Sequence, residues 1–424
     1  MLLEFRLANY RSFRTEEAFS LVASTDKTLQ AENTIETLIS GTPRALRAAA
    51  IYGANASGKT NLVRALQLMR GVVVESAALK PDQTFNLQSF QLDENSKTAP
   101  TLFEVTVVLD GVRHQYGFEF TRNRITREWL LVYKRSKPQA WFDRSAASEG
   151  PDDVRFSAHL AGPKQVWREV TRNNALLLST AVQLNGEALR PLFNWFASSL
   201  VIFLEGGLLP HDFTTQLVET PSGSSRVQSF LSAADIGISS ITTWQTKAFG
   251  QSLHVDLATG QSTSTRLDQE VKLPRFHHSS GQNTAAFELF DESQGTQKLY
   301  SLAAPLFDVL EKGMVLVIDE LDRSLHPLLV RKIINTFQNP ELNRHGAQLI
   351  FTTHDTAQLG GPLLRRDQIW LTEKQQDQSS TLVPLADFSP RKGEALEKGY
   401  LAGRYGGVPI LANDLFDEGA FGEK

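Results

Sequence analysis

Apolar positions divide the two ends of the chain into strands and helices. Near the start, Leu3, Phe5 and Leu7 alternate with polar or small residues, a period that is typical of a half-buried strand. Near the other end, the unbroken apolar run Met314–Ile318 predicts a strand buried on both faces. The elements expected there are helix 295–311, strand 314–319, helix 326–338 and strand 347–353. Strands that alternate with helices predict a parallel sheet and therefore the α/β fold class.

The middle of the chain has a different pattern. Three strand-like runs over 101–135, with the turn signal Asp110-Gly111 between the first two, predict an antiparallel β subdomain. Helical periodicity follows over 164–196 and again over 226–245. We therefore expect an N-terminal lobe over 1–160, a mainly helical insertion over 161–280 and a C-terminal lobe over 281–424.

Composition excludes several classes of function. The 424 residues include 43 Lys and Arg and 47 Asp and Glu, a net charge of −4. The chain is therefore not a basic coat for nucleic acid, although a local basic groove remains allowed. The absence of cysteine excludes disulfides, thiol nucleophiles and Cys-ligated zinc. We expect a cytoplasmic protein without a membrane partner, because no signal-peptide pattern and no apolar run long enough for a bilayer is found.

One segment has the pattern of a phosphate-binding loop. Gly53-Ala54-Asn55-Ala56-Ser57-Gly58-Lys59-Thr60 fits G-x-x-x-x-G-K-[ST], between a strand signal and an amphipathic helix. In such a loop the backbone N–H groups and the start of the following helix bind phosphate. We expect Lys59 to reach the β- and γ-phosphates and the Thr60 hydroxyl to bind Mg²⁺. The residues expected to bind nucleotide here are Gly53, Asn55, Ser57, Gly58, Lys59, Thr60 and Asn61. The alternative, a glycine-rich surface turn with an incidental lysine, is disfavoured by the flanking strand and helix.

Polar residues follow the two buried strands of the C-terminal part. Asp319 and Glu320 come directly after Ile318, at a strand end where α/β sheets place ligands. Asp319 suits Mg²⁺, and Glu320 is placed to orient or deprotonate an attacking water. The alternative is a solvated surface pair, which the preceding apolar run disfavours. His354 follows the next strand and is either an ordinary loop residue or a contact for the γ-phosphate or its water.

A helix start about 20 residues before the acidic pair is a second candidate anion site. Glu292-Ser293-Gln294-Gly295-Thr296-Gln297-Lys298 opens this helix with a serine and a glycine. The pattern is explained either by ordinary capping or by an anion site made of N–H groups and a hydroxyl. A chain with both this site and a phosphate loop could share one nucleotide between two copies.

Taken in order, these motifs resemble those of the ABC-type ATPase heads (P-loop NTPases) of the SMC and RecF-like families. Gly53–Thr60 looks like Walker A, Ser293–Lys298 like the signature motif, Val315–Glu320 like Walker B, Leu321-Asp322 like the D-loop and His354 like the switch histidine. Asn9–Phe13 looks like the opening segment of this group, which implies that Arg11 lies near the nucleotide. The resemblance implies ATP and Mg²⁺ bound between two copies, with Glu320 catalytic, Asp322 nearby, and Ser293 and Gly295 supplied by the other copy.

Narrower features are similar to the prokaryotic RloA/abortive-infection ATPases. They are Tyr10-Arg11-Ser12-Phe13, the Glu292-Ser293-x-Gly295-Thr296 signature, His326-Pro327 and the terminal Gly399-Tyr400-x-x-Gly403-Arg404-Tyr405-Gly406. This resemblance implies the sensor or regulator ATPase of an antiphage defence system. The alternatives are a RecF-like DNA repair ATPase and a nucleotide-dependent scaffold with little turnover. The role of 399–406 is left open, as are direct DNA binding and the choice of Gln88 or Gln91 as the Q-loop residue.

Two features of these families are missing from the sequence. Only about 120–150 residues separate the two halves of the head, which excludes the long coiled-coil arms of SMC proteins, and without cysteines there is no zinc hook. About 70 residues follow His354, too few for an appended Toprim nuclease. We therefore expect any nuclease, possibly of Toprim type, to reside in a separate effector that works with a homodimer or higher homo-oligomer.

Overall fold

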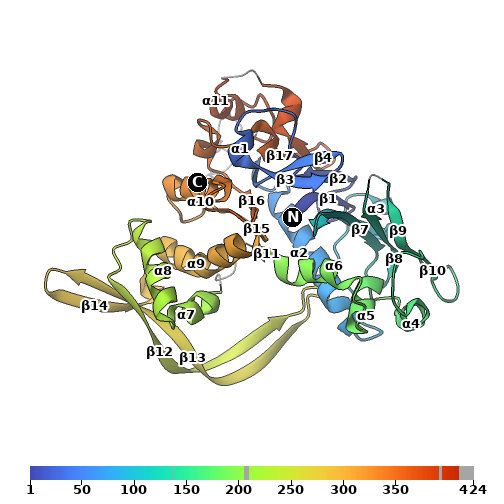
Figure 1. Ribbon diagram of the computed structural model, residues 1–424, viewed down its shortest axis with the longest axis horizontal. Coiled ribbons are helices and arrows are strands. Elements are labelled where there is room, and N and C mark those ends of the chain that lie inside the picture. The colour runs from blue at the N-terminus through green and yellow to red at the C-terminus, as the bar shows by residue number, and fades with distance from the viewer. Residues whose placement is uncertain (136, 205–209, 391–393, 410–424) are drawn as a thin grey trace, which may run out of the picture.

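A six-stranded sheet lies at the centre of the computed structural model, which describes residues 1–135, 137–204, 210–390 and 394–409, without the side chains of 248–254 and 265–269. The strands follow the order β11 (Leu200–Phe203), β15 (Val315–Ile318), β16 (Gln348–Thr352), β5 (Ala48–Gly53), β17 (Ile369–Lys374) and β18 (Ser380–Pro384). All neighbours are parallel except β17 and β18, which are antiparallel. The predicted parallel sheet and the α/β class are confirmed (Figure 1).

Alternate residues of β5 point to opposite faces of this sheet and divide the core in two. Ala49 and Ile51 pack with α2 (Lys59–Glu75) and with the antiparallel sheet. Ala48, Ala50 and Tyr52 instead pack with α9 (Gln294–Lys312) and α10 (Pro327–Gln338). Because both faces are covered, β5, β15 and β16 are buried along their whole length.

A seven-stranded antiparallel sheet packs on the α2 side. The expected three-strand meander is β6 (Thr101–Leu109), β7 (Val112–Phe120) and β8 (Ile125–Tyr133), so that prediction is confirmed. The other strands are β1 (Leu2–Ala8), β2 (Glu17–Ser20), β9 (Gln139–Ser145) and β10 (Asp153–Phe156). Asp110 and Gly111 both have positive φ, 49° and 72°, as a tight hairpin requires.

Shorter elements complete this half of the molecule. They are α1 (Gln30–Asn33), β3 (Thr34–Ile39), β4 (Thr42–Leu46), α3 (Glu94–Thr98), α4 (Lys164–Val170), α5 (Leu177–Gln183) and α6 (Arg190–Asn194). Trp167 of α4, Leu177 of α5 and Leu192 of α6 are buried in the same core as the antiparallel sheet. Within the described ranges, no helix is both long enough and apolar enough to cross a membrane.

The stretch 161–280 differs from the mainly helical insertion expected there. Its last helices are α7 (Asp212–Val218) and α8 (Pro221–Ser232), so the helix expected over 226–245 ends at Ser232. A long antiparallel pair follows, β12 (Ser240–Val255) with β13 (Ser262–Ser280), and β14 (Asn283–Glu288) lies beside β13. The run Ile241-Thr242-Thr243-Trp244 explains the change, because β-branched and aromatic residues favour strands. β11 also lies in this stretch and joins the central sheet, and the division at 160 and 280 stays a prediction.

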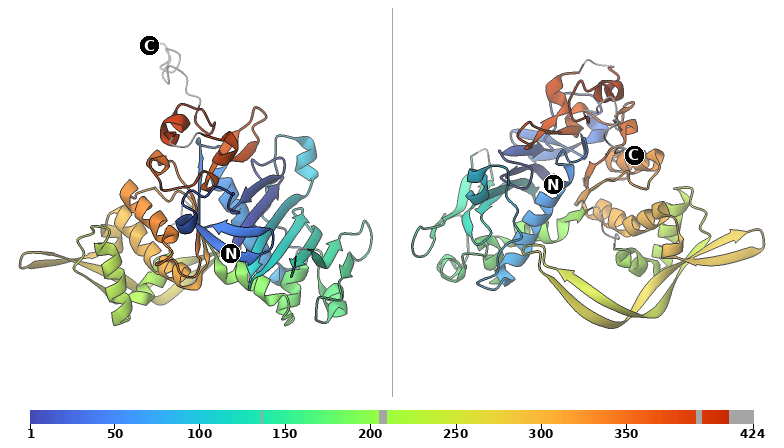
Figure 2. Two further views of the ribbon diagram at one scale, coloured as in Figure 1. Left: turned by 45° about the horizontal axis from the view of Figure 1, so that its top comes forward. Right: turned by 180° about the vertical axis from the view of Figure 1, so that it is seen from behind.

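The β12–β13 pair forms an arm that crosses the molecule (Figures 1 and 2). Its turn packs on the C-terminal end of α2, where Ala258 is fully buried. The Ala258 N–H donates to Glu75 Oε2 at 3.2 Å, and the Ala258 carbonyl accepts from the Asn86 N–H at 2.6 Å. The arm therefore links the region of α7 and α8 to the helix that follows the phosphate loop.

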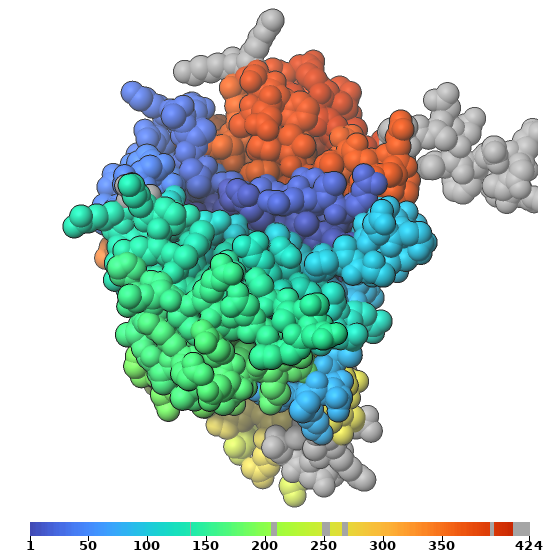
Figure 3. Space-filling view, turned by 90° about the vertical axis from the view of Figure 1, so that its right-hand side faces the viewer, coloured from blue at the N-terminus to red at the C-terminus, as the bar shows by residue number. Residues whose placement is uncertain are grey.

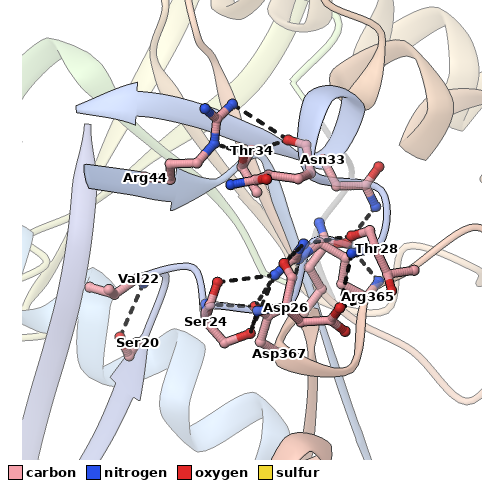
Figure 4. Close-up of polar contacts among 12 residues, drawn as sticks. Ser20, Val22, Ser24, Asp26, Thr28, Asn33, Thr34, Arg44, Arg365 and Asp367 are labelled. Carbon is pink, nitrogen blue, oxygen red and sulfur yellow. Dashed lines mark hydrogen bonds and ion pairs between the residues drawn. The ribbon is translucent and has the colours of Figure 1, made fainter. Parts of the chain in front are cut away.

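A buried arginine joins the two ends of the chain (Figure 4). The Arg365 guanidinium pairs with Asp367 at 2.7 Å and donates to the carbonyl oxygens of Asp26 and Thr28 at 2.8 and 2.5 Å. These partners offset the cost of burying the charge. In the space-filling view, the N-terminal segment lies as a dark blue band against the orange C-terminal part (Figure 3). Segments from both ends can therefore form one site.

Candidate nucleotide-binding site

The predicted phosphate loop is the turn between β5 and α2. β5 ends at Gly53 and α2 begins at Lys59, and between them Ala56 and Gly58 have positive φ of 60° and 120°. The Lys59 ammonium folds back into this turn, where Nζ donates to the carbonyls of Gly53 at 2.8 Å and Ala54 at 3.2 Å. Burial lowers the pKa of Lys59 to about 8, while Glu320 and Asp319 act in the opposite direction. The turn therefore holds a buried cation.

Three serine and threonine side chains from the sheet and the N-terminus fix the loop. Thr372 Oγ1 of β17 lies 2.5 Å from Ser57 Oγ, and Ser380 Oγ of β18 donates to the Ser57 carbonyl at 2.6 Å. Asn61 Nδ2 donates to Ser12 Oγ at 2.9 Å. A Cβ at position 58 would lie 2.5 Å from Ser380 Oγ, so the loop requires Gly58 there. Asn55 is the most open of the expected residues and lies on the exposed side of the turn.

A cavity of about 790 Å³ adjoins the loop at the start of α2. Its lining includes Arg11, Asn61, Gln88, Gln91, Arg122 and Lys374. Arg11 is thus placed beside the loop, and its N–H donates to the Gln88 carbonyl at 2.8 Å. Both Q-loop candidates line the cavity, so the choice between Gln88 and Gln91 stays open. Four cationic residues line the cavity, Arg11, Lys97, Arg122 and Lys374, and their positive charge suits an anionic ligand.

Asp319 lies opposite the loop at the end of β15. Thr60 Oγ1 donates to Asp319 Oδ1 at 3.3 Å, and Thr352 Oγ1 donates to the same oxygen at 2.7 Å. Asp319 is 4% exposed, and its Oδ2 is buried without a hydrogen-bond partner among the described residues. Because β16 alone separates β15 from β5 in the sheet, the two motifs meet at the same sheet edge.

Glu320 follows in an unusual backbone conformation. Its φ of 51° is left-handed, which is uncommon for a residue with a side chain, and its N–H donates to Thr352 Oγ1 at 2.7 Å. The side chain is 26% exposed. Burial, followed by the charges of Asp319 and Asp322, raises the pKa of the Glu320 carboxyl. A carboxylate with a raised pKa and access to solvent can take a proton from water.

His354 and Asp322 are adjacent at this edge. The His354 N–H donates to Asp322 Oδ2 at 3.2 Å, and the His354 side chain is exposed. Burial and then the Lys59 charge lower the pKa of His354, which favours the neutral imidazole. Asp322 Oδ1 is buried and has no hydrogen-bond partner within the described structure. The predicted residues Lys59, Thr60, Asp319, Glu320, Asp322 and His354 are thus brought together.

The helix start at Ser293 is built differently. Ser293 caps α9, because its Oγ accepts from the Thr296 N–H at 3.2 Å, and it is exposed. A Cβ on Gly295 would lie 2.7 Å from the Ser324 carbonyl. Lys298 donates to the carbonyls of Glu320 and Leu321 at 2.8 and 3.0 Å. Among the described residues, no hydrogen bond joins Ser293 or Gly295 to the Gly53–Thr60 loop of the same chain.

The sequence model of one protein family matches the chain. It covers residues 48–359, about three quarters of the chain, and is described as "AAA domain, putative AbiEii toxin, Type IV TA system". The matched span contains the phosphate loop, the Ser293 helix start, the Asp319-Glu320 pair and His354. The chain belongs to this family. The expected membership among abortive-infection ATPases is therefore confirmed. The matched span leaves out Arg11 and the terminal motif over 399–406.

Solved structures of SMC heads are similar to this AAA domain protein. The SMC head domain from Thermotoga maritima is 14% identical, with a TM-score of 0.40 over 90% of this chain and 98% of that one. A SmcHead bound to the C-winged helix domain of ScpA is 13% identical, with a TM-score of 0.42 over 90% and 96%. An Smc head with an extended coiled coil, bound to a ScpA domain from Pyrococcus furiosus, is 12% identical, with a TM-score of 0.39 over 95% and 98%. No curated protein matches the chain.

Proposed function

We propose that the chain is a Mg²⁺-dependent ATPase that hydrolyses ATP to ADP and phosphate. The contact between Thr60 and Asp319 carries this proposal, because it joins the phosphate loop to the acidic end of β15. The charges of Glu320 and Asp319 act on the pKa of Lys59, and Lys59 in turn acts on that of His354. A cation, two carboxylates and an imidazole at one sheet edge are the groups that phosphoryl transfer requires.

The oxygen atoms of Thr60 and Asp319 fit Mg²⁺. A buried carboxylate oxygen without a partner, such as Asp319 Oδ2, is unfavourable unless a cation meets it. Mg²⁺ is held in phosphate-binding sites by one or two protein oxygens together with phosphate oxygens. When bound, the ion would neutralise charge on the β- and γ-phosphates, and Thr60 and Asp319 would hold it.

Each of these protein groups has its own role in hydrolysis. Lys59 leaves the carbonyls of Gly53 and Ala54 and donates to the phosphates. Glu320 accepts a proton from the water whose oxygen attacks the γ-phosphorus, while the bond to the ADP oxygen breaks. His354 donates to the γ-phosphate or orients this water. Arg11 and Asn61 contact the remainder of the nucleotide from the adjoining cavity.

Affinity for ATP is expected to fall as the pH rises through about 8. Lys59 binds phosphate as an ammonium, and burial lowers its pKa to about 8 in the chain without nucleotide. Below that pH the charge is present, whereas above it each binding event takes up a proton, so the dissociation constant rises by up to about ten-fold per pH unit. Titration with a fluorescent ATP analogue from about pH 7 to about pH 9.5 measures this change. A dissociation constant that stays flat over this range contradicts the assignment of Lys59.

Two copies share each nucleotide in this proposal. Ser293 is exposed, and Gly295 and Lys298 contact the D-loop side of their own chain. In this proposal the exposed start of α9, with Ser293, meets the γ-phosphate held by Lys59 of a second copy. Hydrolysis then requires the homodimer to close.

Mixing two inactive variants is expected to restore activity. A Ser293→Arg chain keeps its phosphate loop, and a Lys59→Ala chain keeps its helix start. Their heterodimer has one intact site and one doubly damaged site. Phosphate release by the mixture should rise to a substantial fraction of the parent rate, provided that one intact site suffices, whereas each variant alone stays inactive.

The matched control mixes Ser293→Arg with Ser293→Arg/Lys59→Ala, because no dimer of these chains contains an intact site. Heterodimers of the first mixture, once shown to form, could still release no more phosphate than this control. In that case one of two assumptions is wrong: that two copies share each nucleotide, or that one intact site can hydrolyse ATP without the other. ATP-bound coordinates separate the two explanations. Ser293 within hydrogen-bond reach of the γ-phosphate on its own chain's Lys59 would exclude sharing.

The biological role that we propose is sensor or regulator ATPase of a cytoplasmic antiphage defence system. The family description, which names an AbiEii toxin and a type IV toxin–antitoxin system, supports this role. The proposal assigns the effector, for instance a Toprim-type nuclease, to a separate chain.

Two measurements test the function. Phosphate release from ATP, with Mg²⁺ and with EDTA, tests the activity, and a parent chain that releases none in Mg²⁺ overturns it. Phage plating on cells that carry this gene with its neighbours tests the role, with Lys59→Ala as the comparison. ATP-gated loading on duplex DNA without any effect on plating favours a repair ATPase of RecF type.

A further inference from the structure

The terminal glycine and tyrosine motif packs against the phosphate loop. α11 (Leu396–Leu401) and the residues after it form a segment over 396–407 that we name the C-terminal clasp. Tyr400 is buried, and its ring meets the ring of Tyr52, the residue before Gly53, edge to face at 5.7 Å between centroids. The Tyr400 hydroxyl donates to the Gly407 carbonyl at 3.0 Å. The motif is thus part of the surroundings of the site.

Gly407 of the clasp lies beside Gly53, the first residue of the phosphate loop. Gly407 has a φ of 70°, a conformation that favours glycine. A Cβ at this position would make ordinary van der Waals contacts with Gly53 Cα at 3.7 Å and with the Thr372 carbonyl at 3.6 Å, so the clasp backbone lies within the width of a small side chain of the loop. Burial raises the pKa of the Tyr400 hydroxyl. The hydrogen bond from this hydroxyl to the Gly407 carbonyl therefore holds Gly407 beside Gly53.

The clasp also contacts the loop that follows His354. Thr356 Oγ1 donates to Glu397 Oε1 at 3.0 Å. From the β5 side, the Tyr52 hydroxyl donates to the Asp355 carbonyl at 3.2 Å. One short helix thus contacts Tyr52, the residue before the phosphate loop, through Tyr400. Through Glu397 it contacts the loop that follows His354, which we name the switch loop.

We infer that Tyr400 and Glu397 are positioning residues that fix the phosphate loop and the switch loop relative to each other. This inference rests on the proposed ATPase function. Tyr400 acts through Gly53, whose carbonyl holds Lys59 at 2.8 Å, and so affects any nucleotide that carries a β-phosphate. Glu397 acts through Thr356, two residues after His354, and so affects the γ-phosphate step alone.

Removal of the Tyr400 hydroxyl tests the first half. Tyr400→Phe keeps the ring contact with Tyr52 and loses the hydrogen bond to the Gly407 carbonyl. Affinity for both ATP and ADP should fall about five-fold, the effect of one such bond, in titrations with fluorescent analogues of each nucleotide. The matched control is Tyr405→Phe, which loses a hydroxyl that donates to Glu394 at 2.7 Å within the same motif. Its affinities should equal those of the parent.

A second variant tests the switch loop independently. Thr356→Val keeps the shape of the side chain and removes the donor to Glu397. The turnover number should fall about five-fold, while the dissociation constant for ADP stays at the parent value. Loss of folded protein would also lower the apparent turnover number and leave the dissociation constant unchanged, so the turnover number is calculated per ADP-binding site counted in the same titration.

The outcomes separate the inference from the function on which it rests. A parent chain that neither binds nor hydrolyses ATP overturns both. If the parent is active but Tyr400→Phe binds nucleotide as well as Tyr405→Phe does, the positioning role is wrong and the function stands. Equal losses in the two tyrosine variants, in step with lower thermal midpoints, identify the clasp as ordinary core packing and also overturn the inference.

Discussion

Lys59→Ala is expected to abolish ATP hydrolysis and to weaken ATP binding by at least about 100-fold. The Lys59 ammonium is the buried cation of the loop, held by the Gly53 and Ala54 carbonyls. Without it, those carbonyls face the phosphates with no positive charge between them, and a charge-assisted contact in a water-poor site is lost. Phosphate release and titration with a fluorescent ATP analogue measure the two effects.

The folded state should survive this substitution. Burial lowers the pKa of Lys59, which means that keeping this ammonium desolvated reduces the folding stability of the chain without nucleotide. Alanine therefore leaves the thermal midpoint unchanged or raises it slightly. Lys332→Ala, at an exposed position of α10, is the matched control and should leave binding and turnover at parent values. Hydrolysis by Lys59→Ala at the parent rate would remove the loop from the mechanism.

Local patterns predicted the parts of the site that lie on single elements. The loop Gly53–Thr60 is set by glycine positions, and β15 by an apolar run that ends in a carboxylate. Both are properties of a few consecutive residues, so the sequence alone is sufficient to find them. The meander over 101–135 was predictable for the same reason, since Asp110-Gly111 specifies its first turn.

The side chains that fix the loop could not be predicted. Thr372 and Ser380 lie more than 300 residues from Ser57, on strands where a hydroxyl residue is ordinary. Thr352, which bonds both Asp319 and the Glu320 N–H, likewise reads as a plain strand residue. Their role arises from the order β15-β16-β5-β17-β18, which the sheet assembles from both ends of the chain. The available signal was the position of Thr352 and Thr372 toward the C-terminal ends of buried stretches of strand, whereas Ser380 begins β18.

The end of the helix expected over 226–245 was wrong for a different reason, since β12 begins at Ser240. Sequence period identifies a strand only when one face is buried, whereas over 240–247 Ile241 alone is buried and Thr243, Trp244 and Thr246 are half-buried. Its polar residues therefore do not alternate with a regular row of buried apolar residues. The buried Ala258 at the turn is a single small residue whose contact with Asn86 depends on the tertiary fold.

Glu320→Gln is expected to keep ATP binding and to lower the turnover number by about 10² to 10⁴, the range for loss of a general base. The amide retains the shape of the side chain, and the left-handed backbone at 320 is held by the Thr352 hydroxyl rather than by the carboxylate. The amide cannot take a proton from water. Glu341→Gln, at an exposed loop position, is the matched control and should hydrolyse ATP at the parent rate.

The same variant reports on the assembly. Replacing Glu320 also removes one negative charge from the group formed with Asp319 and Asp322, whose repulsion adds to burial in raising the pKa of Glu320. Bound ATP, which brings further negative charge to this edge, should then be tolerated better and hydrolysed too slowly for the dimer to reopen. Sedimentation of Glu320→Gln with ATP and Mg²⁺ should therefore give a dimer, and without nucleotide a monomer. If the protein is a monomer under both conditions although ATP is demonstrably bound, Ser293 cannot contact the γ-phosphate held by a second copy. That result would exclude sharing of the nucleotide between copies.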